Sequence, residues 1–165
     1  MNFNDNITKN FKWYEFFKSS TALRHDMNNY TNDKDVLKNI EMLTTNILQP
    51  LRDVFGPIKI TSGYRSPLLN TLIKGSPTSN HCYGYAADIE PWDDSIKLID
   101  IIEYIHGNFQ YRELIAEYFP EGWVHVAYRD KANNRQLKLK DQDHHYTPIG
   151  IYELIELYGN DCLDV

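Results

Sequence analysis

The chain has 165 residues, a length that suits one domain built around a single hydrophobic core. Its 42% hydrophobic and 24% charged residues are ordinary for a globular protein. The net charge of −6 argues against a nucleic-acid-binding protein, which would normally carry a basic face, and against strong adhesion to acidic polymers.

The first residues carry no basic segment followed by an apolar stretch, so we expect no signal peptide and a cytoplasmic location at synthesis. No apolar run along the sequence approaches membrane-spanning length, so membrane insertion is not expected either. The two cysteines, Cys82 and Cys162, lack the paired spacing of a disulfide framework, which favours a reducing compartment.

The clearest helical pattern covers residues 34–55, where apolar residues recur at three- and four-residue steps along one face. Gly56 and Pro57 end this pattern. Pro50 lies inside it, which predicts either a kink or an early end of the helix near Gln49.

The remaining patterns predict a mixture of short strands and helices. In chain order they are a strand at 58–61, a short helix at 66–74, a strand at 85–89, a helix at 95–106 and a strand pair at 113–117 and 123–128. Residues 130–141 are polar and basic and are expected to form a surface loop or an edge strand, whereas residues 148–158 have an apolar helical pattern. Without repeats or internal linkers, these elements predict one α+β domain over residues 1–165.

Three residues form a candidate metal site. Asp88 lies in the predicted strand at 85–89, His125 lies in the predicted strand at 123–128, and Gly84 would let the chain turn so that His81 swings back beside Asp88. Two imidazoles and one carboxylate leave one tetrahedral position for water, which distinguishes a catalytic zinc site from a closed structural one. A histidine and an aspartate at this spacing are a weak signal alone, and a solvated loop histidine with a capping aspartate is the usual alternative.

The surrounding sequence carries three motifs: Ser-Gly-Tyr-Arg-Ser-Pro at 62–67, Ser-Asn-His-Cys-Tyr-Gly-Tyr-Ala-Ala-Asp at 79–88, and Trp-Val-His-Val at 123–126. In this order they resemble the zinc D-alanyl-D-alanine carboxypeptidase family, which shares its fold with the Hedgehog signalling domain. The resemblance covers about residues 10–135. It implies a small antiparallel sheet flanked by helices. The apolar helical pattern beyond this segment predicts a C-terminal helical extension at about 142–165.

The same resemblance implies that His81, Asp88 and His125 bind Zn²⁺. Arg65 would hold the substrate carbonyl and its developing oxyanion, since a fixed guanidinium supplies charge where charge appears in the transition state. The alternative for Arg65 is a structural ion pair with an acid such as Asp88 or Glu90.

The resemblance implies a general base shortly before the last metal ligand, often in a Leu-Ile-x-Glu string, which Glu117 ends here. The segment from Glu117 to His125 is about two residues longer than the resemblance suggests, so Glu121 is a rival. Glu117 would end a strand that points at the metal, or would be a surface charge on an edge strand, whereas Glu121 lies in a predicted turn. Ser79 is expected either to hydrogen-bond the substrate or to serve in a turn or helix cap.

The resemblance implies a zinc-dependent peptidase that hydrolyses peptide bonds in peptidoglycan stem peptides, either as a D,D-carboxypeptidase or as a lysis endopeptidase. We expect a phage- or virus-encoded enzyme, monomeric, that reaches the cell wall after release or as part of a virion. The alternative is a structural module of a virion or larger assembly that binds zinc and the cell wall without catalysis.

Overall fold

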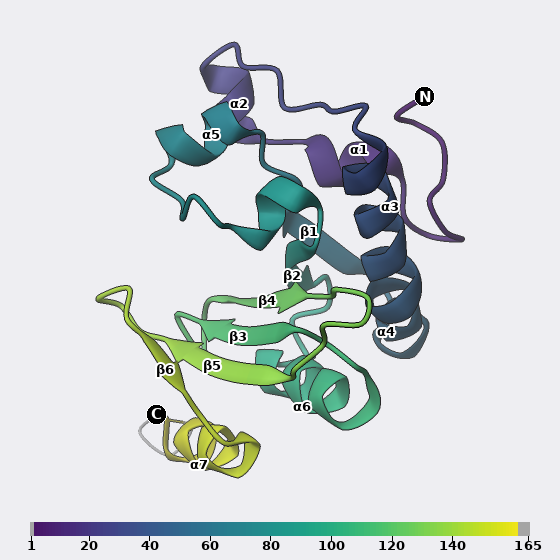
Figure 1. Cartoon of the computed structure of the whole chain (residues 1–165). Helices are drawn as coiled ribbons and strands as arrows, with labels where there is room; N and C mark the ends of the chain where they lie inside the picture. Colours follow the sequence, from purple (N-terminus) through teal and green to yellow (C-terminus); the bar gives the residue numbers. More distant parts are fainter. Residues whose placement is uncertain (1, 162–165) are drawn as a thin grey trace.

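The computed structural model describes residues 2–161, and within them six strands form one sheet in the order β1-β2-β4-β3-β5-β6 (Figure 1). The strands are β1 (Ile58–Ser62), β2 (Ala86–Pro91), β3 (Glu113–Glu117), β4 (Trp123–Ala127), β5 (Gln136–Lys140) and β6 (Tyr146–Pro148). Neighbouring strands are antiparallel except β3 and β5, which are parallel. The predicted α+β class with a small, mostly antiparallel sheet is confirmed.

The helices lie around this sheet in two groups. They are α1 (Trp13–Phe17), α2 (Ser20–Arg24), α3 (Lys34–Leu43), α4 (Gln49–Phe55), α5 (Pro67–Leu72), α6 (Leu98–Asn108) and α7 (Ile151–Asp161), with a π-helical turn at Thr44–Leu48 and a 3₁₀ turn, η2, at Asn80–Tyr83. Helices α1, α3 and α4 gather near β1, whereas α6 and α7 lie together on the side of β3 and β5 (Figure 1). No helix in residues 2–161 combines the length and the apolar character needed to cross a bilayer.

The helical pattern predicted at 34–55 is present over its full length, but it contains a π turn at Thr44–Leu48, shortly before Pro50. A proline has no N–H to donate into a helix. The backbone N–H of Gln49 bonds to the carbonyl of Thr44, five residues earlier, which widens the helix locally. The interruption expected near Gln49 is therefore a widened turn within a helix that continues to Phe55.

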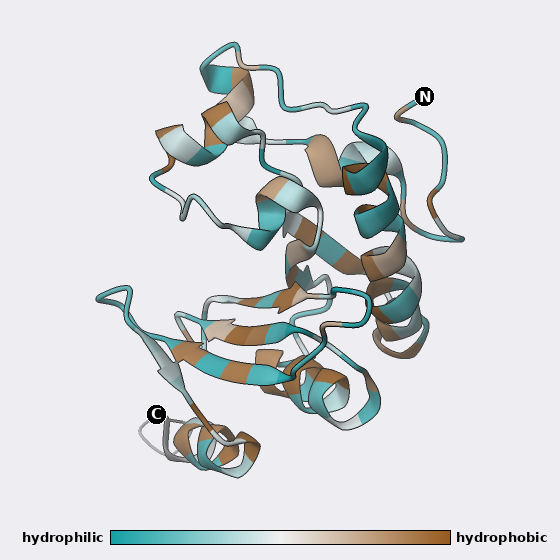
Figure 2. Cartoon of the chain, viewed as in Figure 1, coloured by the Kyte–Doolittle hydropathy of each residue, from teal (hydrophilic) through white to brown (hydrophobic). Residues whose placement is uncertain are grey.

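The sheet has one apolar and one polar face, because side chains alternate along each strand. The apolar face carries the buried residues Leu114, Ala116, Val124, Val126 and Leu137, which belong to the same core as Ile101, Ile102 and Ile105 of α6. The alternation is visible along β5 as successive hydrophilic and hydrophobic segments (Figure 2). The opposite face is left for polar side chains, and the candidate site lies there.

One expectation for the C-terminal part is wrong. Residues 136–140 form neither a surface loop nor an edge strand, since β5 lies inside the sheet between β3 and β6. The apolar helical pattern at 148–158 corresponds to α7, and the short strand β6 precedes this helix. In β5 two leucines alternate with three polar residues, so a strand with one face in the core has the composition of a surface segment. The last four positions of the predicted extension, Cys162 among them, lie outside the described residues.

Candidate metal centre

Two neighbouring strands and one 3₁₀ turn bring the candidate ligands together. Asp88 in β2 is paired directly with His125 in β4, so their side chains leave the same face of the sheet side by side. His81 comes from η2, whose C-cap is Gly84 with a φ of 72°. Asn39 of α3 holds this turn by donating a side-chain hydrogen bond to the carbonyl of Tyr83. The ligands therefore rest on elements that are fixed by the rest of the fold.

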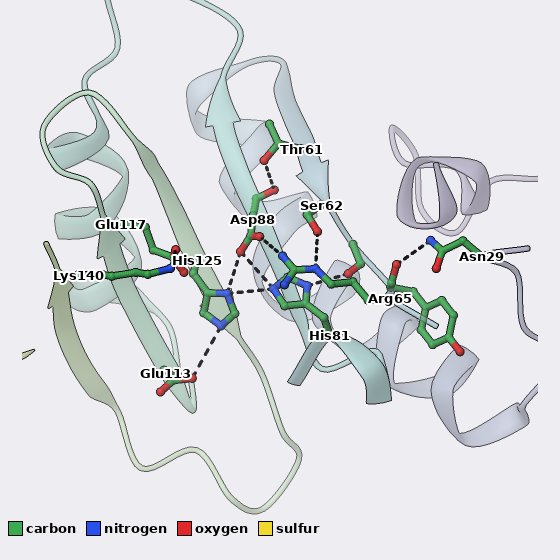
Figure 3. Close-up of polar contacts among 12 residues, drawn as sticks. Asn29, Thr61, Ser62, Arg65, His81, Asp88, Glu113, Glu117, His125 and Lys140 are labelled. Carbon is green, nitrogen blue, oxygen red and sulfur yellow. Dashed lines mark hydrogen bonds and ion pairs between the residues drawn. The ribbon is translucent and has the colours of Figure 1, made fainter. Parts of the chain in front are cut away.

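The three side chains converge on one point (Figure 3). His125 Nδ1 lies 2.8 Å from Asp88 Oδ1, and His81 Nε2 lies 3.2 Å from the same oxygen. His81 Nε2 and His125 Nδ1 are 3.2 Å apart. All three residues are buried, and one nitrogen or oxygen atom of each lies within 4.8 Å of the others. Such a set could hold a metal ion.

The hydrogen bonds of His81 show which of its ring nitrogens is free to coordinate a metal. His81 Nδ1 lies 2.7 Å from the carbonyl oxygen of Gly63, which can only accept, so Nδ1 carries the proton and Nε2 presents a lone pair. Burial lowers the pKa of His81, which favours the neutral ring that a metal requires. A histidine whose second nitrogen donates to a backbone carbonyl is the usual arrangement of a zinc ligand. The donor set therefore fits Zn²⁺.

Asp88 connects the ligand set to Arg65. Burial alone would raise the pKa of Asp88, but the charges and hydrogen bonds of His81 and His125 hold it well below its usual range, so the group is ionised. Arg65 Nη2 donates to Asp88 Oδ2 over 2.6 Å, and its Nε donates to Ser62 Oγ over 2.9 Å. The ion pair considered as the structural alternative for Arg65 is thus present with Asp88.

The other acid considered for Arg65 lies elsewhere: Glu90 pairs with Lys59 over 3.1 Å. Arg65 nevertheless borders an open cleft of about 1360 Å³ that also contains the three candidate ligands. Ser79 borders this cleft as well, and it precedes η2 without capping it through its side chain. Both residues therefore border the same cleft as the three candidate ligands.

The two candidate bases differ in their surroundings. Glu117 ends β3, is buried, lines the cleft and accepts a hydrogen bond from Lys140 Nζ over 2.7 Å. Because β3 is an interior strand, Glu117 is not a surface charge at a sheet edge. Glu121 is exposed in the turn between β3 and β4 and is not among the described residues that line the cleft.

Sequence reasoning missed a third acidic residue, Glu113. Its Oε2 lies 3.8 Å from His125 Nε2 and accepts a hydrogen bond from Asn80 Nδ2 over 3.2 Å. Burial would raise the pKa of Glu113, but the hydrogen bond from Lys138 and the charge of His125 lower it. The position of Glu113 could be predicted in part, because residues 113 and 117 of one strand must face the same side of the sheet.

A comparison with known protein families finds a match within the N-terminal three quarters of the chain. The family model described as Peptidase M15 matches residues 9–127. No curated protein matches the chain. The match covers β1 to β4 with all three candidate ligands, and it ends before β5, β6 and α7 begin.

Proposed function

The chain belongs to the peptidase M15 family of zinc-dependent peptidases, and on that premise we propose that it hydrolyses peptide bonds in peptidoglycan stem peptides, as a D,D-carboxypeptidase or a lysis endopeptidase. The observation that carries the proposal is the buried convergence of His81, Asp88 and His125 at the floor of an open cleft. Zinc held by these three ligands would lower the pKa of a coordinated water into the neutral range and would polarise a carbonyl.

Glu117 is the proposed general base. Its Oε2 is bonded to Lys140, whereas its Oε1 makes no hydrogen bond to the residues described. In the proposed mechanism Oε1 accepts a proton from the attacking water and returns it to the amine that leaves. Glu121 is the weaker candidate, because its exposed position in the turn lies outside the cleft.

Arg65 is the proposed oxyanion partner. Its Nη2 and Nε are engaged by Asp88 and Ser62, which fixes the plane of the guanidinium. Its Nη1 makes no hydrogen bond within the described part of the chain. A fixed positive charge at this position would stabilise the oxyanion of the tetrahedral intermediate without reorganisation. Ser79 is proposed to contribute a hydroxyl group to substrate binding at the rim of the cleft.

The charge of the cleft supports a substrate that carries carboxylates, as stem peptides do. Three acidic cleft residues are already paired with Arg65, Lys138 or Lys140. Three further cations, Lys74, Arg112 and Arg129, also border the cleft and form no ion pair within residues 2–161. The chain as a whole has a net charge of −6, so this local excess of positive charge would favour acidic peptides over neutral ones.

The proposed place of action follows from the proposed substrate. Peptidoglycan lies outside the cytoplasmic membrane, so the protein would act on the wall after release from the cell or as part of a virion. In both cases the proposed partner is the peptide of the wall, with no nucleic acid involved.

The test is digestion of purified peptidoglycan by the wild type, Glu117→Gln and the matched control Glu121→Gln, with zinc content measured for each. We expect zinc-dependent release of new amino groups, a loss of at least about 10²-fold in Glu117→Gln, and near-normal rates in Glu121→Gln. Mass spectrometry of the products identifies the bond cleaved.

Three outcomes would contradict the proposal. A wild type that holds zinc yet releases no amino groups would indicate a binding module without catalysis. Cleavage of ordinary L-peptides alone would refute the peptidoglycan assignment. A larger loss in Glu121→Gln than in Glu117→Gln would reverse the assignment of the base.

A further inference from the structure

Strand β5 lies beyond the segment that matches the peptidase family, yet one of its lysines contacts the proposed base. We propose that Lys140 is a positioning residue for the reaction: it holds Glu117 Oε2 so that Glu117 Oε1 faces the attacking water. This inference rests on the proposed function. It assigns part of the catalytic apparatus to the C-terminal strands.

The contact between the two residues is short and shielded from solvent. Lys140 Nζ lies 2.7 Å from Glu117 Oε2, and the two side chains are only 14% and 9% exposed (Figure 3). Glu117 and Lys140 are direct partners in the parallel pairing of β3 with β5, so the backbone register brings them together. A charge-assisted hydrogen bond with little access to water is stronger and better oriented than a surface ion pair.

Lys140 is itself held in place by residues around it. Its Nζ lies over the ring of Tyr118 at 4.9 Å and over the ring of Tyr146, in β6, at 5.2 Å. The hydroxyl of Tyr118 is in turn 2.6 Å from His144 Nδ1. A long lysine side chain normally retains much rotational freedom, and these contacts remove most of it. Lys140 can therefore act as a fixed support for the carboxylate.

A purely structural ion pair explains the arrangement less well. The alignment of β3 with β5 is already set by backbone pairing at five positions and by the buried Leu137 on the opposite face. A buried ion pair contributes little net stability, because desolvation of both charges offsets their attraction. Orienting a carboxylate towards one point is a task for which such a pair is well suited, since proton transfer depends strongly on position.

The test is a double-mutant cycle with Lys140→Met in the wild-type and Glu117→Gln backgrounds, measuring kcat, KM, zinc content and Tm. In the wild-type background we expect kcat to fall on the order of 10- to 100-fold, with zinc content and KM nearly unchanged. In the Glu117→Gln background the same change should have little further effect on kcat. Lys140→Arg should retain more activity than Lys140→Met.

The matched control is Lys59→Met, which removes a lysine–glutamate pair of similar length between β1 and β2, outside the cleft. If Lys140→Met does not fold, Lys140→Gln takes its place in the cycle. An equal loss of kcat in both backgrounds, or an unchanged kcat in an active wild-type background, would overturn the inference alone. A wild type without zinc-dependent hydrolysis would overturn the proposed function and this inference with it.

Discussion

Asp88 is the residue on which the candidate site depends most. One of its carboxylate oxygens faces the two histidines and the other accepts a hydrogen bond from Arg65. The residue that would bind zinc is thus directly joined to the residue that would hold the oxyanion. A change at Arg65 should therefore affect both functions, in proportions that can be measured separately.

We expect Arg65→Ala to reduce kcat by about 10² to 10³-fold at saturating zinc, because one oxyanion donor is removed. Zinc affinity should also fall, by about 10- to 100-fold, since Asp88 loses the partner that orients its second oxygen. Steady-state kinetics and competition with a chelator measure the two effects. Normal kcat at saturating zinc would mean that Arg65 only supports Asp88.

The sequence could predict the ligands but not the contacts around them. His81, Asp88 and His125 lie in motifs that are visible in one sequence, and the structure brings them together. Alternation along β3 places Glu113 on the same face as Glu117, whereas Lys140 reaches Glu117 only through the parallel pairing of β3 with β5, which joins residues 23 positions apart. No local pattern specifies which strands become neighbours, so Lys140 could not be identified as part of the site.

Among the elements, the 3₁₀ turn η2 lies so close to α3 that a side chain at its C-cap would not fit. Gly84 ends it in the left-handed region, at a φ of 72°, and a Cβ there would lie 2.6 Å from the carbonyl oxygen of Val36 in α3. The residue is a glycine for two reasons, since both its backbone conformation and its distance from α3 exclude a side chain. His81 lies three residues earlier in the same turn.

Gly84→Ala should therefore reduce the free energy of unfolding by about 1–3 kcal/mol and weaken zinc binding, because η2 must move away from α3. Urea unfolding with and without zinc measures both effects. Gly107→Ala in α6 is the matched control, since nothing lies within 4 Å of its added Cβ, and it should be neutral or stabilising. An equal loss of stability in Gly84→Ala and Gly107→Ala would refute the explanation that a side chain at residue 84 collides with α3.

Helix α6 ends next to a titratable contact on the far side of the sheet from the cleft. His106 Nδ1 lies 2.5 Å from the hydroxyl of Tyr111, and burial, followed by the charge of Arg135, lowers the pKa of His106. The unfolded chain therefore binds this proton more readily than the folded one, and folding stability falls as pH decreases through about 6.5.

We accordingly expect His106→Gln to lose less stability than the wild type between pH 7.5 and pH 5.5. The difference between the two proteins isolates His106, because the histidines of the metal site contribute equally to both. Urea unfolding at each pH measures it, with the exposed His25→Gln as the control. Parallel stability curves for wild type and His106→Gln would contradict the expectation.

Long periodic elements could be predicted from the sequence, whereas local irregularities and strand order could not. The helix at 34–55 was predictable because its apolar period extends over many residues, whereas the π turn before Pro50 is a local adjustment that the period does not encode. The interior position of β5 could not be predicted either. A strand with one face in the core and one in a polar cleft has the same composition as a surface segment.

In the molecule as a whole, one face of the sheet contributes to the core and the other face carries the candidate site. Its apolar face packs on α6 and on Leu154 of α7, and its polar face carries the cleft. The family match ends at residue 127, but the sheet continues through β5 and β6. The C-terminal strands therefore contribute to both faces, supplying Leu137 to the core and Lys140 to the cleft.

A chain shortened to residues 1–130 should consequently fail to fold cooperatively, although it retains the matched segment and all three candidate ligands. The truncation removes buried Leu137 and Leu154, each worth about 1.5–3 kcal/mol, and leaves β3 with an unpaired edge. Together the two residues account for about 3–6 kcal/mol, a large share of the stability of a typical domain, which is about 5–15 kcal/mol. The truncation also removes the lysine that contacts Glu117.

Circular dichroism and urea unfolding test this expectation. The control is Tyr152→Ala in the full chain, which alters α7 at a side chain that is 80% exposed and should leave stability unchanged. A shortened chain that unfolds cooperatively, binds zinc and hydrolyses its substrate at the full rate would show that β5, β6 and α7 are dispensable. The catalytic unit would then be the matched segment alone, and the support that Lys140 gives to Glu117 would have no consequence for the reaction.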